Sequence, residues 1–374
     1  MVLLIGNYPP DQQQSMQRFG TMMLSGLTSA GVPVELIQPR PVFGKLTFAG
    51  AFVAKWLAYI DKFLLFPRQL RAQLKSHPAI VHICDHSNAM YAKHVGQIPV
   101  VVTCHDLLAV RGALGEATDT PASQTGKLLQ RWVLSGLQRA SSIACVSRTT
   151  FEDAERLVRQ EPDGPQLRVI PLGLSYPYRR LERAEARARL ARIPELNPAL
   201  PFVLHVGSNL RRKNRAAVLR IFSRSKSQWN GQLVFVGEHL NEALVEEAAR
   251  LGITERIVQL GARENEELEA LYNGATGFLF PSRFEGFGWP IVEAQACGCP
   301  VLCSAVPPMI EIAGAGAQLY PPEDEEGFAR ALLGLTNPEE YARWSAAALT
   351  NAQRFTTAQM IAEYRELYRS LAPV

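Results

Sequence analysis

The stretch Gly277-Phe-Leu-Phe-Pro-Ser-Arg-Phe-Glu285-Gly-Phe-Gly-Trp-Pro290-Ile-Val-Glu293 joins an apolar run to a helix-forming run through a loop with two glycines. The first four residues suit a buried strand, and Pro290 favours the start of a helix, because proline is well tolerated in a first helical turn. The apolar run is continuous rather than alternating, which is typical of a strand covered on both faces of a parallel sheet. The stretch therefore predicts one strand–loop–helix unit of an α/β fold.

The same unit recurs along the chain. The chain has 374 residues, which exceeds the ~250–300 that one hydrophobic core usually organises. Six apolar runs in each half predict two Rossmann-like doubly wound parallel-sheet domains, whose strand ends face one another across a cleft. The expected strands are Val2–Ile5, Val34–Ile37, Ile80–Ile83, Val100–Thr103, Ser142–Val146 and Leu167–Ile170, and then Phe202–Val206, Leu233–Val236, Ile257–Leu260, Gly277–Phe280, Val301–Ser304 and Ala317–Tyr320.

A segment rich in Arg, Glu and Ala, Leu181–Pro201, separates the two halves and suits a short helix with a linker. We therefore expect an N-terminal domain over residues 1–185 and a C-terminal domain over residues 186–355. Residues 356–374 are expected to form a helix that returns to the first domain. Its buried face, at helical spacing, would consist of Met360, Ile361, Tyr364, Leu367 and Tyr368.

Two carboxylates mark the loop quoted above. Glu285 lies in the loop and Glu293 lies within the helix, where both can accept hydrogen bonds from the hydroxyl groups of a sugar or ribose. The start of the helix favours phosphate, because its N–H groups and dipole attract anions. An isolated glutamate early in a helix is also common as a solvated cap, so the pair alone leaves both interpretations open.

A basic turn, Arg211-Arg212-Lys213, follows the strand that ends near Gly207. Such a turn is either solvated or binds phosphate, and its place after a strand favours phosphate. The net charge of +4 is unevenly spread, because residues 1–190 hold 22 lysines and arginines against 14 acids. A basic first half indicates an anionic partner, which could be a phosphate-bearing substrate, a membrane surface or nucleic acid.

Several classes of protein are disfavoured. No Gly-x-Gly-x-x-Gly follows the first strand and no Walker loop occurs, which argues against a dehydrogenase and a P-loop enzyme. The cysteines at 297, 299 and 303 match no common zinc spacing, so no metal site is expected. The chain begins with a strand-like run rather than a signal peptide, and buried cysteines suit a reduced compartment, so we expect a cytoplasmic protein.

The second half resembles glycosyltransferase family 4, whose GT-B members carry a Glu-x7-Glu signature in a Phe-Glu-Gly-Phe-Gly loop. Glu293-Ala-Gln-Ala-Cys-Gly-Cys-Pro-Val301 continues this pattern, as does His205-Val-Gly207-Ser-Asn-Leu-Arg-Arg212-Lys213-Asn214. The resemblance implies a retaining enzyme that uses a nucleotide sugar and needs no metal or other cofactor. It also implies that residues 1–185 form the acceptor-binding domain and residues 186–355 the donor-binding domain. It departs from the family at Ser208, where an arginine is frequent, and in the loop that starts at Asn7, where a glycine pair is frequent.

The resemblance also implies roles for single residues. Glu285 would contact the hydroxyls of the donor sugar, Glu293 the ribose, and Arg212 with Lys213 the diphosphate. Fixed cations at that place stabilise the charge that develops on a leaving diphosphate. In the first half, His105 would contact the donor sugar, and the catalytic candidates are thus His105, Glu285, Arg212 and Lys213. The expected donor-binding residues are Gly207, Glu285, Gly286, Phe287, Gly288, Glu293 and, in the loop that would meet the base, Arg263.

An aromatic and basic segment spans Lys45–Lys75. It interleaves six aromatic residues, among them Phe48, Phe52 and Trp56, with cations such as Lys55. This pattern suits an amphipathic helix on an anionic membrane surface, and it equally suits a pair of core-facing helices with solvated lysines. Lys55 within the apolar run argues against a transmembrane helix.

Together these features predict a hexosyltransferase that moves a hexose from GDP-mannose or a UDP-sugar to a hydroxyl group. The expected acceptor is a glycan or lipid-linked glycan of cell-surface polysaccharide synthesis, and the expected place is the cytoplasm or the inner face of the membrane. No nucleic-acid partner is expected. A different GT-B enzyme, such as an epimerase or a polymer-extending synthase, and a non-catalytic nucleotide-sugar-binding or membrane scaffold with the same fold are the alternatives.

Overall fold

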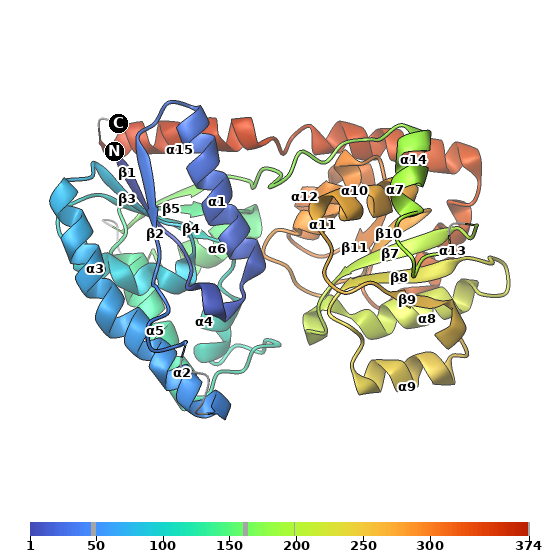
Figure 1. The fold of residues 1–374 in the computed structure, drawn as a ribbon, viewed down its shortest axis with the longest axis horizontal. Helices are drawn as coiled ribbons and strands as arrows, with labels where there is room; N and C mark the ends of the chain where they lie inside the picture. Colours follow the sequence, from blue (N-terminus) through green and yellow to red (C-terminus); the bar gives the residue numbers. More distant parts are fainter. Residues whose placement is uncertain (46–49, 160–163, 198, 373–374) are drawn as a thin grey trace. The chain divides into compact units, whose positions relative to one another are not determined.

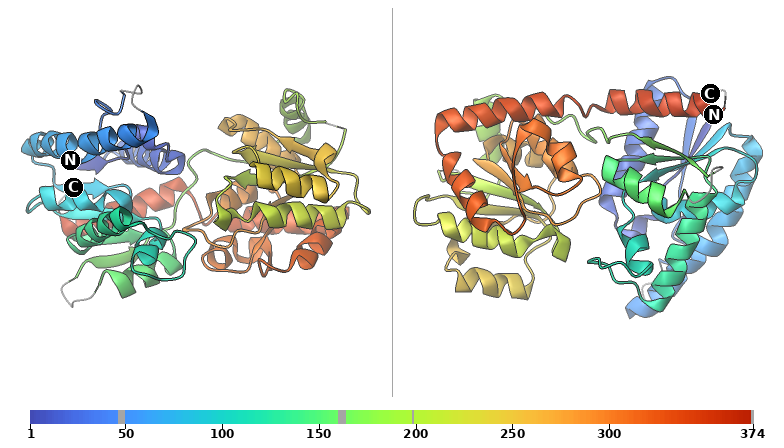
Figure 2. Two further views of the ribbon diagram at one scale, coloured as in Figure 1. Left: turned by 90° about the horizontal axis from the view of Figure 1, so that it is seen from below. Right: turned by 180° about the vertical axis from the view of Figure 1, so that it is seen from behind.

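The computed structural model describes residues 1–45, 50–159, 164–197 and 199–372, and among residues 50–54 only the side chain of Val53. The chain forms two compact units (Figure 1). Unit 1 contains Met1–Ser175 and Thr357–Val374, and unit 2 contains Tyr176–Thr356. Each unit is a parallel sheet with helices on both faces (Figure 2), as the expected fold class requires.

Unit 1 has six parallel strands in the order β2-β1-β3-β4-β5-β6. The strands are β1 (Val2–Ile5), β2 (Val34–Ile37), β3 (Ile80–Ile83), β4 (Val100–Cys104), β5 (Ser142–Cys145) and β6 (Gln166–Val169). The α-helices are α1 (Gln14–Ser29), α2 (Gly50–Ile60), α3 (Phe66–Gln73), α4 (Leu108–Ala113), α5 (Gln124–Gln138), α6 (Arg148–Leu157) and α15 (Thr357–Leu371). A π-helical turn, η3 (Asp61–Leu65), joins α2 to α3.

Unit 2 has six parallel strands in the order β12-β11-β10-β7-β8-β9. The strands are β7 (Phe202–Gly207), β8 (Gln232–Gly237), β9 (Ile257–Gln259), β10 (Gly277–Phe280), β11 (Val301–Ser304) and β12 (Ala317–Tyr320). The α-helices are α7 (Arg183–Leu190), α8 (Arg215–Ser225), α9 (Glu242–Arg250), α10 (Asn265–Gly274), α11 (Trp289–Ala296), α12 (Met309–Ala313), α13 (Glu325–Gly334) and α14 (Pro338–Ala352).

The expected strands are confirmed, and their ends agree to within one residue. Their composition explains the agreement, because β-branched and aromatic residues fit a pleated surface and pay for their ordering by burial on both faces. Each residue of β1 and of β3 is buried, as is each residue of β10 and β11. The core of each unit therefore lies on the two faces of its central strands.

Helix α15 belongs to unit 1, as expected, and packs against α1. The five apolar residues that were expected to form its inner face are all buried. Tyr368 Oη lies 2.6 Å from His82 Nδ1, whose Nε2 lies 2.8 Å from Thr103 Oγ1, and Tyr364 Oη lies 2.7 Å from the same Thr103 oxygen. This buried polar network connects the last helix of the chain to β3 and β4.

The division between the units falls between Ser175 and Tyr176, before the segment Leu181–Pro201 in which the sequence suggested a linker, so α7 lies wholly in unit 2. The boundary expected at 185 would have divided this helix. Helix α7 packs on α10, and Arg189 of α7 forms an ion pair with the buried Glu269 of α10, with 2.9 Å between Nη1 and Oε2. Across the described parts of the chain, no helix is long and apolar enough to span a bilayer.

Candidate functional site

Two loops of unit 2 meet at the point where the strand order reverses. From the central strand β7 the chain proceeds to β8 and β9 on one side, whereas β10 pairs with β7 on the other side. All strands are parallel, so the loops that follow β7 and β10 leave the same edge of the sheet. In open α/β sheets this switch point is the usual place for a ligand.

An ion triad of Arg212, Lys213 and Glu285 joins the two loops. Arg212 Nη1 lies 2.8 Å from Glu285 Oε2, and Lys213 Nζ lies 2.7 Å from Glu285 Oε1. The carboxylate is almost fully buried and Lys213 is mostly buried. Both oxygens of Glu285 thus face cations, in a place where water screens charges weakly.

Charge and burial act against each other in the triad. Burial favours the neutral form and is the largest influence on Lys213, whose pKa it lowers against the opposing effect of Glu285. Burial would also raise the pKa of Glu285, but the positive charges of Lys213 and Arg212 outweigh it and lower that pKa. Glu285 therefore stays ionised and supplies the counter-charge for two cations.

Hydrogen bonds to backbone carbonyl groups fix the two loops relative to each other. The Arg283 N–H donates to Arg212 O at 2.7 Å, and Asn214 Nδ2 donates to Pro281 O at 2.9 Å. Asn214 has a φ of 55°, in the left-handed region, which asparagine adopts more readily than most residues. It stands directly before α8, so the turn that carries Arg212 and Lys213 is anchored at the start of a helix.

Arg215 supports the site and was not foreseen from the sequence. Its guanidinium is almost fully buried and donates to Gly207 O at 2.5 Å and to Glu238 O at 2.6 Å. Burial lowers its pKa to about 10, although the negative charge of Glu238 opposes the shift. Arg215 thus connects the loop after β7 to the loop after β8, and only its place in the run of cations could have indicated this role.

Glycines are required where backbones approach closely. A Cβ on Gly237 would lie 2.2 Å from Gly207 O, and Gly237 has a φ of +111°. Gly288 has a φ of +99° and precedes the first residue of α11. A side chain at either position would be strained, so the backbone can turn at both loops only because these positions are glycine.

The remaining donor-site candidates are arranged differently from the triad. Glu293 is buried in α11, and its Oε2 accepts a hydrogen bond of 3.0 Å from Tyr272 Oη. Phe287 is buried, with its ring 5.6 Å from that of Phe355, so its side chain packs in the apolar interior. Gly286 lies between Glu285 and Phe287 in the same loop.

Arg263 is engaged at the edge of the sheet. It follows β9, whereas the triad follows β7 and β10. Its Nη2 lies 2.6 Å from Glu195 Oε1, its Nη1 lies 3.3 Å from Glu267 Oε1, and its Nε donates to Leu260 O at 2.7 Å. The structure therefore does not join Arg263 to the triad.

His105 belongs to unit 1, where it follows β4. It is buried, and its Nε2 lies 3.0 Å from Cys84 O; because a carbonyl only accepts, Nε2 carries the proton. Burial is the largest influence on its pKa and lowers it, although the charge of Asp85 opposes the shift. The Phe19 ring packs edge-on against the imidazole at 5.0 Å. Burial thus favours the neutral form of the imidazole, and the contacts with Cys84 and Phe19 hold the ring in place.

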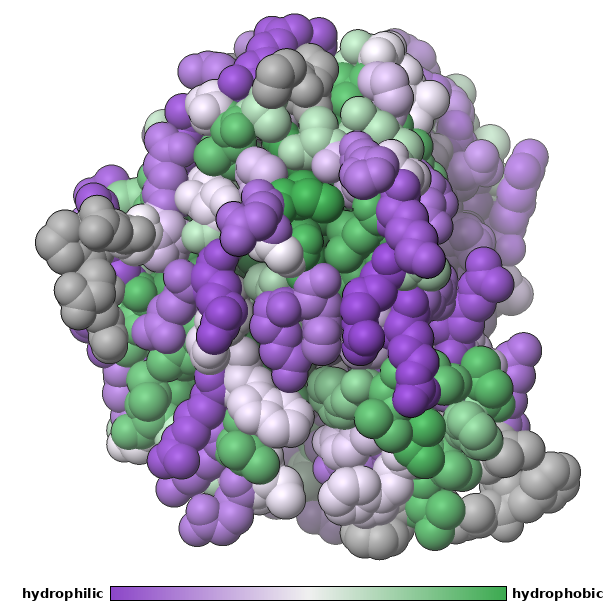
Figure 3. Space-filling model, turned by 90° about the vertical axis from the view of Figure 1, so that its left-hand side faces the viewer, coloured by the Kyte–Doolittle hydropathy of each residue, from purple (hydrophilic) through white to green (hydrophobic). Residues whose placement is uncertain are grey.

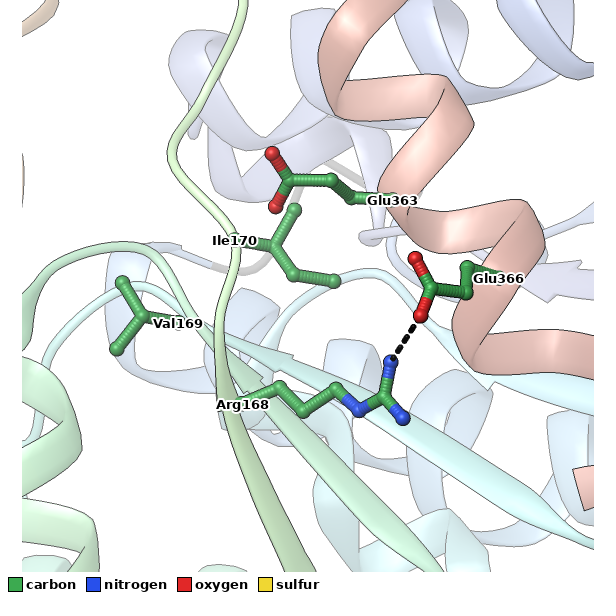
Figure 4. A pocket seen from close by; sticks show the side chains of 5 residues that line it. All are labelled: Arg168, Val169, Ile170, Glu363 and Glu366. Carbon is green, nitrogen blue, oxygen red and sulfur yellow. Dashed lines mark ion pairs between the residues drawn. The ribbon is translucent and has the colours of Figure 1, made fainter. Parts of the chain in front are cut away.

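A separate cavity of about 310 Å³ lies in unit 1 (Figure 4). Its walls come from β6 and the residue after it, and from Glu363 and Glu366 of α15. Arg168 Nη1 lies 3.8 Å from Glu366 Oε1, and burial, aided by Glu366, raises the pKa of Glu363. None of the candidate site residues lines this cavity.

The cysteines are buried, and burial raises the pKa of the thiols at 297, 299 and 303 above the ordinary value. Protonated, buried thiols are inert as ligands and nucleophiles. Among the residues that the structure describes, no group of three or more histidines, cysteines or acids is arranged to hold a metal ion.

Comparisons with known proteins agree with this architecture. The family model described as "Glycosyltransferase Family 4" matches residues 16–175, and that described as "Glycosyl transferases group 1" matches residues 187–350. A D-inositol 3-phosphate glycosyltransferase of Segniliparus rotundus is 28% identical over 80% of this chain and 70% of its own length. O-antigen chain mannosyltransferase B of Escherichia coli is 30% identical over 44% of this chain and 46% of its own length.

Solved structures share the fold at low identity. Sucrose-phosphate synthase from Thermosynechococcus elongatus superposes with a TM-score of 0.76 and 21% identity, over 99% of this chain and 98% of that chain. Alr3699/HepE from Anabaena, solved with UDP and glucose, gives a TM-score of 0.73 and 17% identity over 99% of each chain. The two sheets, their order and the two family models lead to one assignment: the chain is a glycosyltransferase of family 4, with the GT-B fold.

Proposed function

We propose that the protein transfers a hexose from a nucleoside-diphosphate sugar, either GDP-mannose or a UDP-sugar, to an acceptor hydroxyl group with retention of anomeric configuration. The observation that carries the proposal is the ion triad at the switch point of unit 2. Arg212 and Lys213 are partly buried and share a single carboxylate, so the pair keeps a net positive charge that a second anion can neutralise. A diphosphate is the anion that a nucleotide sugar offers.

In this proposal Glu285 is a placeholder, which means that its carboxylate neutralises the two cations until the donor diphosphate binds. Without ligand it neutralises Arg212 and Lys213, at 2.8 and 2.7 Å. A bound diphosphate would take over that role, and the carboxylate would then accept hydrogen bonds from the donor sugar's hydroxyls. The exchange keeps each buried charge paired, which matters because an uncompensated charge in such a place is costly.

The cations also act on the reaction. The bond between the anomeric carbon and the donor phosphate oxygen breaks, and the bond to the acceptor oxygen forms on the same face. The diphosphate gains negative charge in this step, so Arg212 and Lys213 stabilise the transition state more than the bound donor. The acceptor proton goes to the donor phosphate oxygen, and no metal ion is needed to balance the charge.

Other residues complete the donor site in the proposal. Glu293 binds the ribose, the backbone around Gly207 and Gly286–Gly288 allows close approach of the donor, and Arg263 lies near the base. His105 contacts the donor sugar from unit 1. We further propose a glycan or lipid-linked glycan acceptor of cell-surface polysaccharide synthesis, used at the inner face of the membrane; the name of the E. coli relative supports this class.

The donor assignment is tested by calorimetric titration with GDP-mannose, UDP-glucose and UDP-N-acetylglucosamine, together with the slow release of nucleoside diphosphate without acceptor. Lys213→Ala and Glu285→Ala should each lower kcat/KM by roughly 30- to 150-fold, because one charged contact contributes about 2–3 kcal/mol. Proton NMR of the newly released hexose reports its anomeric configuration.

Glu269→Gln is the matched control, because it breaks a buried carboxylate–arginine pair of unit 2 away from the triad. It should lower stability but leave donor affinity unchanged. If no nucleotide sugar binds, or if both triad variants retain transfer, the donor assignment is wrong. Tight binding without any turnover would favour the non-catalytic scaffold instead.

A further inference from the structure

We propose that unit 1 docks on an anionic lipid bilayer through one face built from α2, η3 and α5. This aromatic face is defined by Val53, Trp56, Leu64, Leu128 and Trp132, which are between 42% and 56% exposed. Membrane docking through this face does not depend on the proposed transfer reaction.

Aromatic rings connect the two helices of this face. The ring of Trp56 lies 5.6 Å from that of Tyr59, Tyr59 lies 5.3 Å from Phe63, and Phe63 lies 6.1 Å from Trp132 of α5. Both tryptophans at the ends of this row are about half exposed. Tryptophan and tyrosine with half-exposed rings are the residues that prefer the boundary between lipid headgroups and acyl chains.

Lysines flank the row of rings. Lys55 Nζ lies 5.9 Å from the Tyr59 ring centroid, and Lys93 Nζ lies 5.5 Å from that of Trp132. Lys62 Nζ lies 5.4 Å from the Tyr59 centroid, but its side chain is mostly buried and pairs with Asp11 at 2.9 Å. Helix α5 carries Lys127 as a further cation. Such cations bring an aromatic surface to anionic headgroups.

Negative charge is scarce on the same helices. Over α2, η3, α3 and α5 the single acidic residue is Asp61, which is buried. Its carboxylate accepts hydrogen bonds from the N–H groups of Val42, Phe43 and Gly44 and from Tyr8 Oη, at 2.8–3.0 Å. Asp61 is therefore occupied internally, and it fixes a loop whose Val42 and Phe43 are also exposed.

The segment from α2 to α3 divides into two parts. Phe66 and Leu70 of α3 belong to the core of unit 1, whereas α2 presents the exposed Trp56 and η3 presents the exposed Leu64. Helix α3 is thus core-facing, together with Phe63 of η3; Phe48 lies outside the described residues, and the side chain of Phe52 is not described. Figure 3 shows apolar side chains gathered at the lower end of unit 1, where α2 lies in Figure 1.

A lipid surface fits this face better than a second copy of the chain. In a symmetric dimer the same patch meets itself, so the cations of this face, such as Lys55 and Lys93, would be brought close to those of the other copy. An anionic bilayer satisfies both chemistries, because the aromatic rings enter the interface while the lysines meet phosphate groups.

The test is flotation of the full chain with vesicles of phosphatidylglycerol and phosphatidylcholine in equal parts, compared with vesicles of phosphatidylcholine alone and without nucleotide sugar. We expect binding to the anionic vesicles that weakens as salt rises. Lys55→Gln should weaken binding about fivefold. Trp56→Ala combined with Trp132→Ala should weaken it about tenfold, because interfacial apolar area is lost.

Matched controls lie in unit 2, where Val245 and Ile310 are similarly exposed and Arg192 is an exposed cation. Val245→Ala with Ile310→Ala, and Arg192→Gln, should leave flotation unchanged. Circular dichroism confirms that each variant is folded. Absent or charge-independent vesicle binding overturns the proposal, as does a dimer in sedimentation that the tryptophan variants dissociate. Slow donor hydrolysis by the same variants, expected to be unchanged, keeps this test separate from that of the transfer reaction.

Discussion

The switch points of the two sheets can be compared directly, because each lies beside a central strand of a parallel sheet. In unit 2 the loops after β7 and β10 carry the ion triad. In unit 1 the loops after β1 and β3 carry a polar cluster of Asn7, Asp85 and Ser87: Asn7 Nδ2 donates to Asp85 Oδ2 at 2.5 Å, and the Ser87 N–H donates to Asp85 Oδ1 at 3.0 Å. The same topology thus presents two different chemistries.

The difference lies in how each carboxylate is paired. Glu285 faces two formal cations, whereas Asp85 faces the neutral donors of Asn7 and Ser87 and the nearby His86. Burial would raise the pKa of Asp85, but His86, His105 and these hydrogen bonds outweigh it and lower that pKa. Both carboxylates are therefore ionised, yet of the two it is Glu285 that is paired with a lysine and an arginine, which can bind a further anion. The loop residues, and not the fold, set this chemistry.

Among the changes that test this comparison, Glu285→Gln should have the largest effect on the free energy of unfolding. This change leaves Arg212 and Lys213 close together without a counter-charge, which should cost about 3–5 kcal/mol of unfolding free energy. Added GDP or UDP should restore part of the loss, because a diphosphate supplies the missing charge. Chemical denaturation with and without nucleotide measures both; an equal gain from nucleotide in wild type and variant would contradict the placeholder role.

Asp85→Asn is the counterpart in unit 1 and should have a smaller effect. The variant keeps one accepting oxygen but places an amide among groups that donate, at an expected cost of about 2 kcal/mol. Nucleoside diphosphates should not restore this loss selectively. Selective rescue, measured in the same denaturation experiments, would show that the two switch points are not chemically distinct.

Each sheet also buries a histidine on a central strand, and these should make both units sensitive to acid. Burial is the largest cause that lowers the pKa of His82 and of His205 from 6.5 to about 3. The unfolded chain binds a proton below pH 6.5 and the folded chain does not, so stability present above 6.5 is lost as pH falls towards 3. The loss is about 1.4 kcal/mol per pH unit for each histidine.

His82→Gln and His205→Gln should therefore each reduce the slope of unfolding free energy against pH between 6.5 and 3 by up to one proton. Glutamine can keep hydrogen bonds to the same neighbours. Urea unfolding at several pH values measures the slope. The carboxylates contribute equally in both proteins, so subtracting the slope of the variant from that of the wild type removes their contribution. A slope unchanged in either variant would mean that the histidine is protonated in the folded unit.

The smallest effect is expected from removing single buried hydroxyls. Tyr364→Phe loses a neutral contact with Thr103 in unit 1, at about 1 kcal/mol, whereas Tyr272→Phe loses a contact with the Glu293 carboxylate in unit 2, at about 2 kcal/mol. Thermal unfolding of both variants gives the two values. The reverse order would imply that Glu293 is protonated in the absence of ligand.

Much of the fold could be predicted because strand formation is local. The runs at Val2–Ile5 and Val301–Ser304 are continuously apolar, and only strands covered on both faces satisfy such a pattern. The inner face of α15 was readable for the same reason, since its apolar residues recur at helical spacing. That α7 belongs to unit 2 could not be predicted from the sequence, because its ion pair joins Arg189 to Glu269, which is distant in the chain.

The sequence by itself determined the two α/β units, their strands and the loops that carry Glu285 and Lys213. Only the tertiary structure decided that Arg212 and Lys213 share one carboxylate, that Arg215 is buried, and that Phe287 packs inward. The physical reason is that the periodic pattern of buried residues involves only a few residues that are neighbours in the sequence. Charge pairing instead depends on which loops the strand order brings to one edge of the sheet.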